Sequence, residues 1–229
     1  YDTTAPSSSV DVIKSVWKKA AATITATASD ATSGVKNATL YYRYRATNAS
    51  GWGGYVSFGV DTASPWSWSF TFVNGTGHYA FYSIAKDNAT NVESAPATND
   101  TNCGYDNVAP SSSVNAITTY WQKTSPLTID GTASDTGGSG LWNVTLWYRY
   151  SSDNNSWGGW VASGLVDSNP WVAVSWNFPF SNNTGYYEFY SIAKDNATNI
   201  ESAPGSYDTF CRYTYVTIPV VVTNASTGV

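Results

Sequence analysis

The chain has 229 residues, of which 42% are hydrophobic, 16% aromatic and only 12% charged. This apolar content is enough to bury a core, which excludes a solvated disordered polymer. The formal net charge of -5 leaves no basic excess to neutralise phosphates, and no apolar run approaches the roughly 20 residues needed to span a bilayer. The sequence therefore predicts neither a nucleic-acid partner nor a membrane span.

Short β-prone segments follow one another through the first half of the chain. Each is rich in β-branched and aromatic residues, several alternate apolar and polar residues, and clusters of Asp, Asn, Gly and Thr separate them. No window has a helical period, and turn signals roughly every 8–12 residues are typical of an antiparallel sandwich of about seven strands. The expected strands cover residues 7–13, 22–29, 37–46, 53–60, 65–72, 77–87 and 91–99.

The same order of segments occurs a second time. The letters FYSIAKDNATN at residues 81–91 recur at residues 189–199, and YDTTAPSSSV at Tyr1 matches YDNVAPSSSV at Tyr105. The offset between the copies grows from 104 to 108, which indicates small loop insertions between retained strands. We therefore expect an all-β chain of two tandem antiparallel β-sandwich domains. Their expected bounds are 1–104 and 105–211, and residues 212–229 form an additional C-terminal strand or tail.

The motifs of each copy resemble a known family. An Asp-x-x-Ala-Pro start, Ser-Gly-Val ahead of Tyr-Arg, a Trp after the next turn and a final Tyr-Ser-Ile-Ala-x-Asp-Asn-Ala-x-Asn are similar to the immunoglobulin-like repeats of prokaryotic cell-surface proteins. The resemblance covers residues 1–204 and implies two immunoglobulin-like sandwiches. Such repeats serve as spacers, adhesin stalks and surface-layer modules, so the resemblance indicates a fold more than a function. The family commonly has Gly where Thr90 and Thr198 stand, and here Thr completes an Asn-x-Thr sequence.

Acceptor sequences for N-linked glycans, Asn-x-Ser/Thr, are frequent in this chain. Ten of the 19 asparagines lie in such a sequence, and Asn37/Asn143 and Asn88/Asn196 occupy equivalent positions of the two copies. Glycosylation would place the chain outside the cytoplasm, and the acidic, Met-free, Thr- and Asn-rich composition favours an archaeal cell surface. The alternative is that Asn and Thr serve only as turn residues. The ten acceptors are Asn37, Asn48, Asn74, Asn88, Asn99, Asn143, Asn154, Asn182, Asn196 and Asn224.

No motif in the sequence predicts an enzyme. The single histidine, His78, has Tyr186 at its equivalent position, and the chain contains neither a glycine-rich phosphate loop nor a Gly-x-Ser-x-Gly elbow. Some acidic positions recur in both copies. They either hold calcium, the one candidate cofactor, near a domain junction or cap turns, and no dense Asp-x-Asp-x-Asp run favours calcium. The recurring pairs are Asp2/Asp106, Asp30/Asp135, Asp61/Asp167, Asp87/Asp195 and Glu93/Glu201.

The tryptophans have two interpretations. Those that recur in both copies, paired as Trp52/Trp157 and Trp66/Trp171, are expected in the core or on the strands, with a sugar-stacking platform as the alternative. Trp142 and Trp160 replace Lys36 and Tyr55 of the first copy, and surplus exposed aromatics at these positions would indicate a contact surface.

The two cysteines and the C-terminal segment are candidates for assembly. Cys103 and Cys211 are equivalent, so neither has a partner within its own domain, and we expect disulfides to neighbouring chains or flanking repeats, with a Cys103–Cys211 bond as the alternative. The letters YVTIPVVV near the C-terminus have no equivalent in the repeat and predict a strand donated to another subunit or folded back on the second domain. The expected assembly residues are Tyr215, Val216, Ile218, Val220, Val221 and Val222.

These features together predict a structural role. The expected function is that of a glycosylated extracellular subunit of a filament, surface layer or adhesin stalk, whose partners are other copies of itself and N-linked glycans. The alternative is a pair of carbohydrate-binding accessory modules from a secreted enzyme, which would require exposed, coplanar Trp rings.

Overall fold

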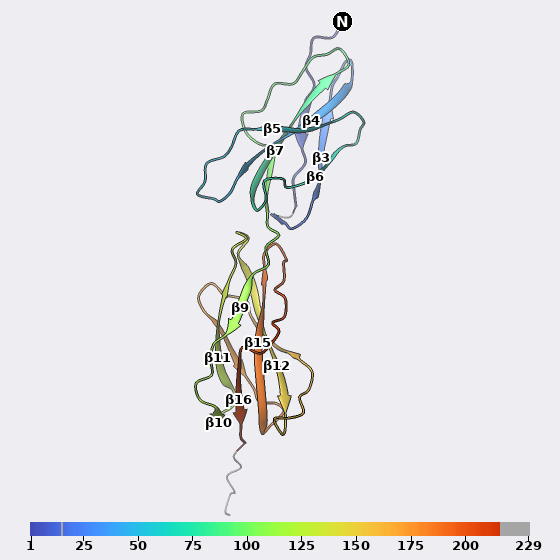
Figure 1. Ribbon diagram of the computed structural model, residues 1–229. Coiled ribbons are helices and arrows are strands. Elements are labelled where there is room, and N and C mark those ends of the chain that lie inside the picture. Colours follow the sequence, from blue (N-terminus) through green and yellow to red (C-terminus); the bar gives the residue numbers. More distant parts are fainter. Residues whose placement is uncertain (15, 216–229) are drawn as a thin grey trace, which may run out of the picture. The chain divides into compact units, whose positions relative to one another are not determined.

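The computed structural model describes residues 1–14 and 16–215. Within these ranges every regular element is a β-strand, and no helix is long and apolar enough to cross a membrane. The strands build two sandwiches, each from a three-stranded and a five-stranded sheet, which confirms the predicted all-β fold (Figure 1). By contact, the chain divides into two compact units: Tyr1–Ser111 with Ser134–Trp142 and Ala193–Glu201, and Ser112–Ala133 with Asn143–Ile192 and Ser202–Val229.

The first sandwich consists of one sheet in the order β1-β3-β6 and one in the order β2-β8-β7-β4-β5. All pairs are antiparallel except β2 with β8, which run parallel. The strands are β1 (Ser7–Val10), β2 (Trp17–Lys18), β3 (Ala22–Ser29), β4 (Val35–Arg45), β5 (Val56–Asp61), β6 (Trp66–Phe70), β7 (Gly77–Asp87) and β8 (Thr101–Tyr105).

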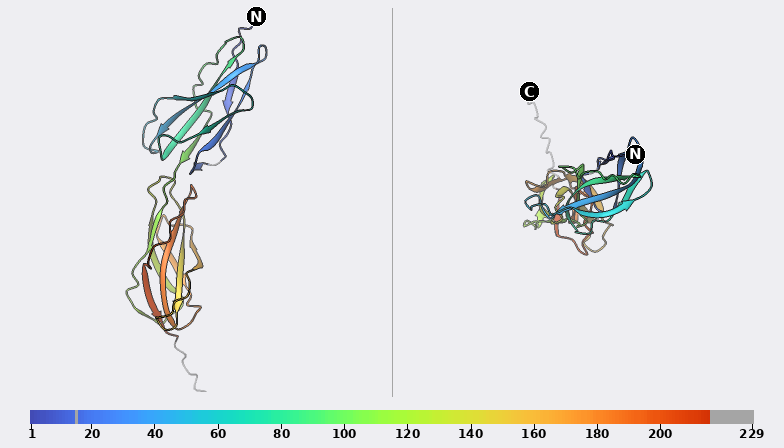
Figure 2. Two further views of the ribbon diagram at one scale, coloured as in Figure 1. Left: turned by 45° about the vertical axis from the view of Figure 1, so that its right-hand side comes forward. Right: turned by 90° about the horizontal axis from the view of Figure 1, so that it is seen from above.

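The second sandwich repeats this arrangement with the orders β14-β11-β9 and β10-β16-β15-β12-β13 (Figure 2). The one parallel pair is again formed by the two-residue strand, β10, with the last strand of the repeat, β16. The strands are β9 (Ser111–Val114), β10 (Trp121–Gln122), β11 (Leu127–Ser134), β12 (Leu141–Ser151), β13 (Val161–Asp167), β14 (Val174–Phe178), β15 (Gly185–Asp195) and β16 (Thr209–Tyr213).

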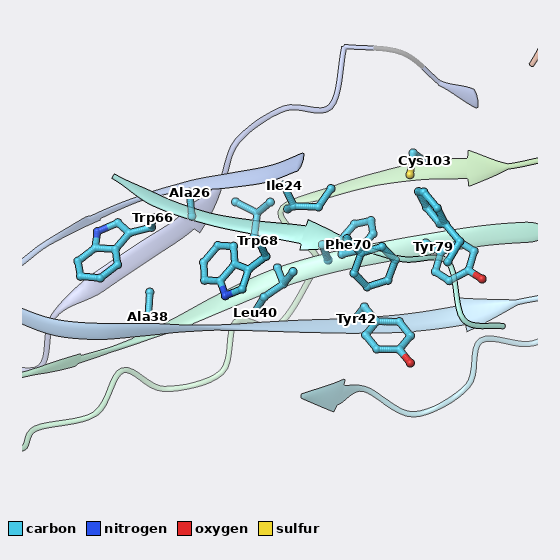
Figure 3. Packing of buried hydrophobic residues seen from close by; sticks show 13 residues of the cluster. Ile24, Ala26, Ala38, Leu40, Tyr42, Trp66, Trp68, Phe70, Tyr79 and Cys103 are labelled. Carbon is cyan, nitrogen blue, oxygen red and sulfur yellow. The ribbon is translucent and has the colours of Figure 1, made fainter. Parts of the chain in front are cut away.

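Alternation of side chains along the strands produces the core. In β6 the residues Trp66, Trp68 and Phe70 are buried while the serines between them are exposed. Their rings point toward β4, where Leu40 and Tyr42 face them from the other sheet (Figure 3). Burial of a side chain of this size stabilises the fold by about 1.5–3 kcal/mol. The period of two seen in the sequence is therefore the period at which residues enter the core.

The last strand of each repeat lies further along the chain than the sequence predicts. Residues 91–99 form no strand apart from one bridge between Val92 and Lys86, and the closing strand is β8, which begins at Thr101. Pro96 and a run of small polar residues interrupt ladder pairing in this segment. Strand β8 ends at Tyr105, so the predicted boundary after residue 104 falls within this strand.

Carboxylates replace strand pairing along the segment that precedes β8. Glu93 accepts hydrogen bonds from the backbone N–H groups of Ser8 and Ala85, each at 2.8 Å, and so joins β1 to β7. Asp100 accepts in the same way from Val10 at 2.8 Å and from Ser83 at 3.3 Å. The segment thereby closes one side of the sandwich without forming a ladder.

The structure corrects one predicted pairing of tryptophans. Trp66 lies opposite Ala26, and the equivalent position in the second sandwich, opposite Gly131, is occupied by Val174. Trp171 precedes β14 in a loop and is 60% exposed, so it is not a core residue. The loop before β14 is longer than its counterpart, which shifts the Asn-Pro-Trp letters out of register.

A glycine in β8 allows an aromatic side chain to cover the sheet. The side chain of Trp17 lies over Gly104, where a Cβ atom would clash with the indole ring. A glycine inside a strand usually weakens it. At Gly104 the missing side chain makes room for the Trp17 ring.

We expect Gly104→Ala to lower the free energy of unfolding by about 1–3 kcal/mol, because the added methyl group must displace the Trp17 ring. Urea denaturation of the full chain measures this change. The control is Gly54→Ala, since no atom lies within 4 Å of a Cβ at Gly54. Equal stability of the two variants would contradict this account.

Candidate functional site

Three aspartates converge in the first repeat. Carboxylate oxygens of Asp2, Asp30 and Asp87 all lie within 4.8 Å of one another. They come from the segment before β1, from the position after β3 and from the end of β7, so the fold brings together residues far apart in the sequence. Asp87 is fully buried, and the other two are half-buried.

Backbone and amide groups hold these carboxylates in place. Asn91 donates its N–H and its Nδ2 to Asp87, both at 2.7 Å, and the same Nδ2 lies 3.2 Å from the backbone oxygen of Asp2. Asp30 accepts from the backbone N–H of Ser33 at 2.8 Å. A hydrogen bond from the Ser33 side chain, supported by the N–H of Thr4, lowers the pKa of Asp2.

The second repeat contains the same arrangement. Asp106, Asp135 and Asp195 again present oxygens within 4.8 Å of one another, and Asp106 and Asp195 are fully buried. Asn199 donates its Nδ2 to Asp195 at 2.8 Å and to the backbone oxygen of Asp106 at 2.9 Å. Gly137 leaves room for Asp106, because a Cβ there would clash with that carboxylate.

The structure divides the recurring acidic pairs into those that form the clusters and those that bind neighbouring strands. Three of the five predicted pairs enter the clusters, where their oxygens form a donor set that suits a hard divalent cation such as calcium. The same oxygens already accept hydrogen bonds that fix the turns, as the alternative prediction requires. The pairs Glu93/Glu201 and Asp61/Asp167 lie outside the clusters and bind backbone N–H groups of neighbouring strands.

The repeated Asn-Ala-Thr sequence forms a turn beside each cluster. The Nδ2 of Asn88 donates to the backbone oxygens of Ser33 and Gly34 at 2.9 and 3.1 Å, and the Nδ2 of Asn196 makes equivalent bonds to the loop at Ser139. The threonines that complete these sequences have positive φ angles of 76° at residue 90 and 72° at residue 198. This conformation is unfavourable for a β-branched residue, by about 1–3 kcal/mol.

The other acceptor asparagines differ in exposure. Six of the ten are exposed and three are half-buried, and Asn224 lies outside the described residues. Asn99 is held on both sides, because its Oδ1 accepts from Arg43 and its Nδ2 lies 3.3 Å from the backbone oxygen of Thr101. The exposed acceptors are Asn48, Asn74, Asn88, Asn154, Asn182 and Asn196, and the half-buried ones are Asn37, Asn99 and Asn143.

Arginine and aromatic side chains cover the outer face of each five-stranded sheet. In the first repeat the guanidinium of Arg43 lies 4.8 Å from the ring centres of both Trp52 and Tyr55. In the second repeat Arg149 lies at 5.0 and 4.9 Å from Trp157 and Trp160. Trp52 and Trp157 therefore pack on strand-borne arginines and are half-buried, so they face the strands as predicted but are not core residues.

The surplus tryptophans of the second repeat lie in different surroundings. Trp160 packs on Tyr190 at a ring distance of 4.3 Å and is half-buried. Trp142 is 48% exposed, and the ammonium of Lys194 lies 4.3 Å above its ring. Neither residue forms a flat, free platform.

An exposed aromatic patch on the second sandwich was missed by the sequence analysis. It consists of Tyr120, Trp121, Tyr207 and Phe210, which are 37%, 48%, 37% and 46% exposed, and we call it the β10–β16 patch. Its rings touch in a chain, with centre distances of 5.6–5.7 Å. A difference between the repeats was visible in the sequence: the residues equivalent to Tyr120, Tyr207 and Phe210 in the first repeat are Val16, Asn99 and Asn102.

The histidine and the cysteines occupy packing positions. His78 lies 5.3 Å from the ring of Trp17, and burial together with the charge of Arg45 lowers its pKa. Both cysteines are free, with Cys103 2% and Cys211 0% exposed, and burial raises the pKa of each thiol to about 12. The predicted interchain disulfides therefore find no exposed thiol in this structure.

Of the predicted assembly strand, Tyr215 lies within the described residues. Tyr215 is 60% exposed, and its N–H donates to the Oγ1 of Thr184 at 2.9 Å. Val216, Ile218, Val220, Val221 and Val222 lie outside the described residues.

Comparison with known proteins identifies no family. No protein-family model matches the chain, and no curated protein does. A solved structure of fibronectin(III)-like modules of CbhA from Clostridium thermocellum is 16% identical, covers 91% of this chain and 95% of its own, and has a TM-score of 0.42. The native conformation of E. coli alpha-2-macroglobulin is 10% identical with a TM-score of 0.30, and the match covers 94% of this chain and 16% of that one.

We expect Asn91→Ala to lower the free energy of unfolding by about 1.5–3 kcal/mol, because buried Asp87 then loses a charge-assisted hydrogen bond. Asn199→Ala should have a similar effect through Asp195. Chemical denaturation measures both, with the exposed Asn102→Ala as the control. A change under about 0.5 kcal/mol in both variants would show that the amides do not hold the clusters.

Acidification should destabilise the first sandwich through His78. Its pKa lies below the ordinary value of 6.5 in the folded chain, so the unfolded chain binds more protons near that pH. Stability is therefore complete above pH 6.5 and falls as the pH drops through this value. Thermal unfolding between about pH 7.5 and pH 5.5 measures the slope. His78→Tyr, which introduces the residue of the second repeat, should reduce the slope, and an unchanged slope would assign it to other groups.

Proposed function

We propose that this chain is a structural subunit of a glycosylated extracellular assembly, such as a filament, a surface layer or an adhesin stalk. The observation that carries the proposal is the β10–β16 patch. Its four aromatic residues are between 37% and 48% exposed and contact one another. Contiguous apolar surface of this kind on a soluble protein marks an interaction site.

The internal construction of the repeats supports a mechanical role. The carboxylates of both clusters accept hydrogen bonds from backbone N–H, asparagine amide and serine hydroxyl groups that join strands and turns, and the groups of metal-ligating residues among the described residues contain no histidine. His78 packs against Trp17. Such groups fix a fold more readily than they transfer protons. We infer that the chain acts by binding and bearing load, without catalysis.

The acceptor sequences support an extracellular, glycosylated setting. Six acceptor asparagines are exposed, and all lie in loops or turns where a bulky glycan can be accommodated. Thr90 and Thr198 keep an unfavourable backbone conformation in which Gly would be less strained. Because Thr is needed to complete the acceptor, its presence at both positions favours modification of Asn88 and Asn196. A glycan on Nδ2 leaves that nitrogen one N–H, which still donates to a backbone oxygen of the facing loop.

The alternative, a carbohydrate-binding module pair, receives less support. Sugar-stacking requires flat, accessible rings, but the planes of Tyr120 and Trp121 meet at 83° and those of Tyr120 and Phe210 at 69°. The exposed ring of Trp142 is covered on one side by Lys194. The perpendicular rings present an uneven apolar surface, which is better suited to a protein partner.

Native material should contain ordered assemblies of this chain with glycans on the exposed acceptors. Negative-stain electron microscopy of the purified native material tests the first point, and mass spectrometry of its glycopeptides tests the second. We expect fibres or sheets, and hexose-containing adducts on peptides that include Asn88 and Asn196. Separate particles at high concentration, together with unmodified asparagines, would contradict the proposal.

A further inference from the structure

We propose that the β10–β16 patch and the adjoining free edge of β10 bind residues 216–229 of a second copy of this chain. This inference rests on the self-assembly proposed above and names the surfaces that meet. The occupant is a strand donated by a neighbouring copy. The docking surface lies entirely within the second sandwich.

The exposure of Trp121 within the patch follows from one position that differs between the repeats. In the first repeat Gly104 lets Trp17 lie flat on the sheet. In the second repeat Arg212 stands at the equivalent position, paired with Trp121, and its guanidinium lies 4.3 Å from that indole ring. Arg212 therefore lifts Trp121 away from the sheet, where it is 48% exposed.

The neighbouring positions complete an apolar surface only in the second repeat. Phe210 replaces Asn102, and Tyr207 replaces Asn99. Around these positions the strand keeps the same structural contacts in both copies, since Thr101 and Thr209 each accept a backbone N–H from the segment after the first strand. The aromatic residues are therefore additions to a fold that is complete without them.

The edge beside the patch can accept another strand. Strand β10 is the outermost strand of its sheet, pairs with β16 on one side only, and has no described strand on the other. An open groove of about 430 Å³ adjoins it, lined by residues 115–119, Gln122 and residues 127–130. A strand added here would place alternate side chains over the patch and over the groove.

Residues 216–229 have the chemistry that this surface requires. Their sequence, VTIPVVVTNASTGV, contains no charged residue and has a run of β-branched side chains. Pro219 is the only turn-forming residue before Asn224, which disfavours reversal of the chain near its start. Tyr215 follows the C-terminal end of β16, whereas Phe210 lies near the beginning of that strand. The segment therefore begins at the end of β16 that is farther from Phe210.

Cysteine cross-linking tests the pairing directly. One chain carries Lys123→Cys beside β10 and another carries Val221→Cys, and the two are mixed in equal amounts under mild oxidation. We expect a disulfide-linked heterodimer, since the native thiols are buried and do not compete. The matched control replaces Lys123→Cys by Lys19→Cys, the equivalent position of the first repeat, and should give none. Equal cross-linking of both mixtures would overturn the inference.

The same two cysteines distinguish a segment donated by a second copy from a segment that folds back on its own chain. A single chain with both Lys123→Cys and Val221→Cys should form linked oligomers. If it instead forms only a monomeric disulfide, the segment covers its own patch and the proposal of a second copy is wrong.

A variant that borrows the residues of the first repeat tests the patch. Tyr207→Asn with Phe210→Asn should weaken self-association of the full chain by about tenfold or more in analytical ultracentrifugation. Its melting temperature should stay close to that of the parent, since the first repeat folds with these asparagines. Unchanged association would refute the patch as the docking site while leaving the proposed function intact. A parent chain that never self-associates would count against both.

Discussion

Buried and half-buried carboxylates that accept backbone N–H groups are the interaction on which both sandwiches depend. Each sheet pair leaves donors unpaired where a strand ends or where the chain crosses between sheets, and an unpaired buried donor costs about 1–3 kcal/mol. Glu93 and Asp100 supply acceptors to β1 and β7 at once, and Asp87 supplies them to the following turn. A segment without ladder pairing thereby becomes part of the wall of the sandwich.

The duplication shows which features the fold needs and which it carries for other reasons. The aspartate clusters, the asparagines that hold them and the stacked arginines recur in both repeats. The aromatic residues of the β10–β16 patch do not recur, and neither does the ion pair between Arg149 and Glu188, whose counterpart in the first repeat is Ala80 opposite Arg43. Since the first repeat forms the same sheets with the other residues, these differences are free to serve contacts outside the domain.

Much of the fold could be predicted from the sequence because strand periodicity and core packing have the same physical origin. Residues 22–29 and 77–87 were predicted with the bounds observed for β3 and β7. The last strand was missed because residues 91–99 resemble a β-prone segment, whereas the segment binds β1 and β7 through the Glu93 carboxylate and not through a ladder. Periodicity does not report such an arrangement. The shift between Trp66 and Trp171 was missed for a related reason. Both repeats contain Pro-Trp before this strand, but a loop insertion in the second repeat moves Trp171 out of register.

The candidate sites were harder to predict because they depend on which distant residues meet. The recurring acids were visible in the sequence, but only the fold separates the three that cluster from the two that bind neighbouring strands. The sequence predicted disulfides of the cysteines to neighbouring chains because the last strand had been placed too early. Once β8 and β16 are located, alternation directs both thiols into the core.

The acceptor sequences show why a count of motifs is weaker evidence than the conformation of each. At Asn99 the fold alone explains the threonine: Thr101 accepts the N–H of Ile13, and Thr209 keeps this role although Tyr207 has replaced the asparagine. At Asn88 and Asn196 the fold explains the asparagine, whose Nδ2 binds the facing loop, but it opposes the threonine, which lies at positive φ. A residue that the backbone disfavours, kept at both equivalent positions, requires a reason outside packing. Completion of a glycan acceptor is such a reason, and these two sites therefore carry more weight than the excess of the motif over the whole chain.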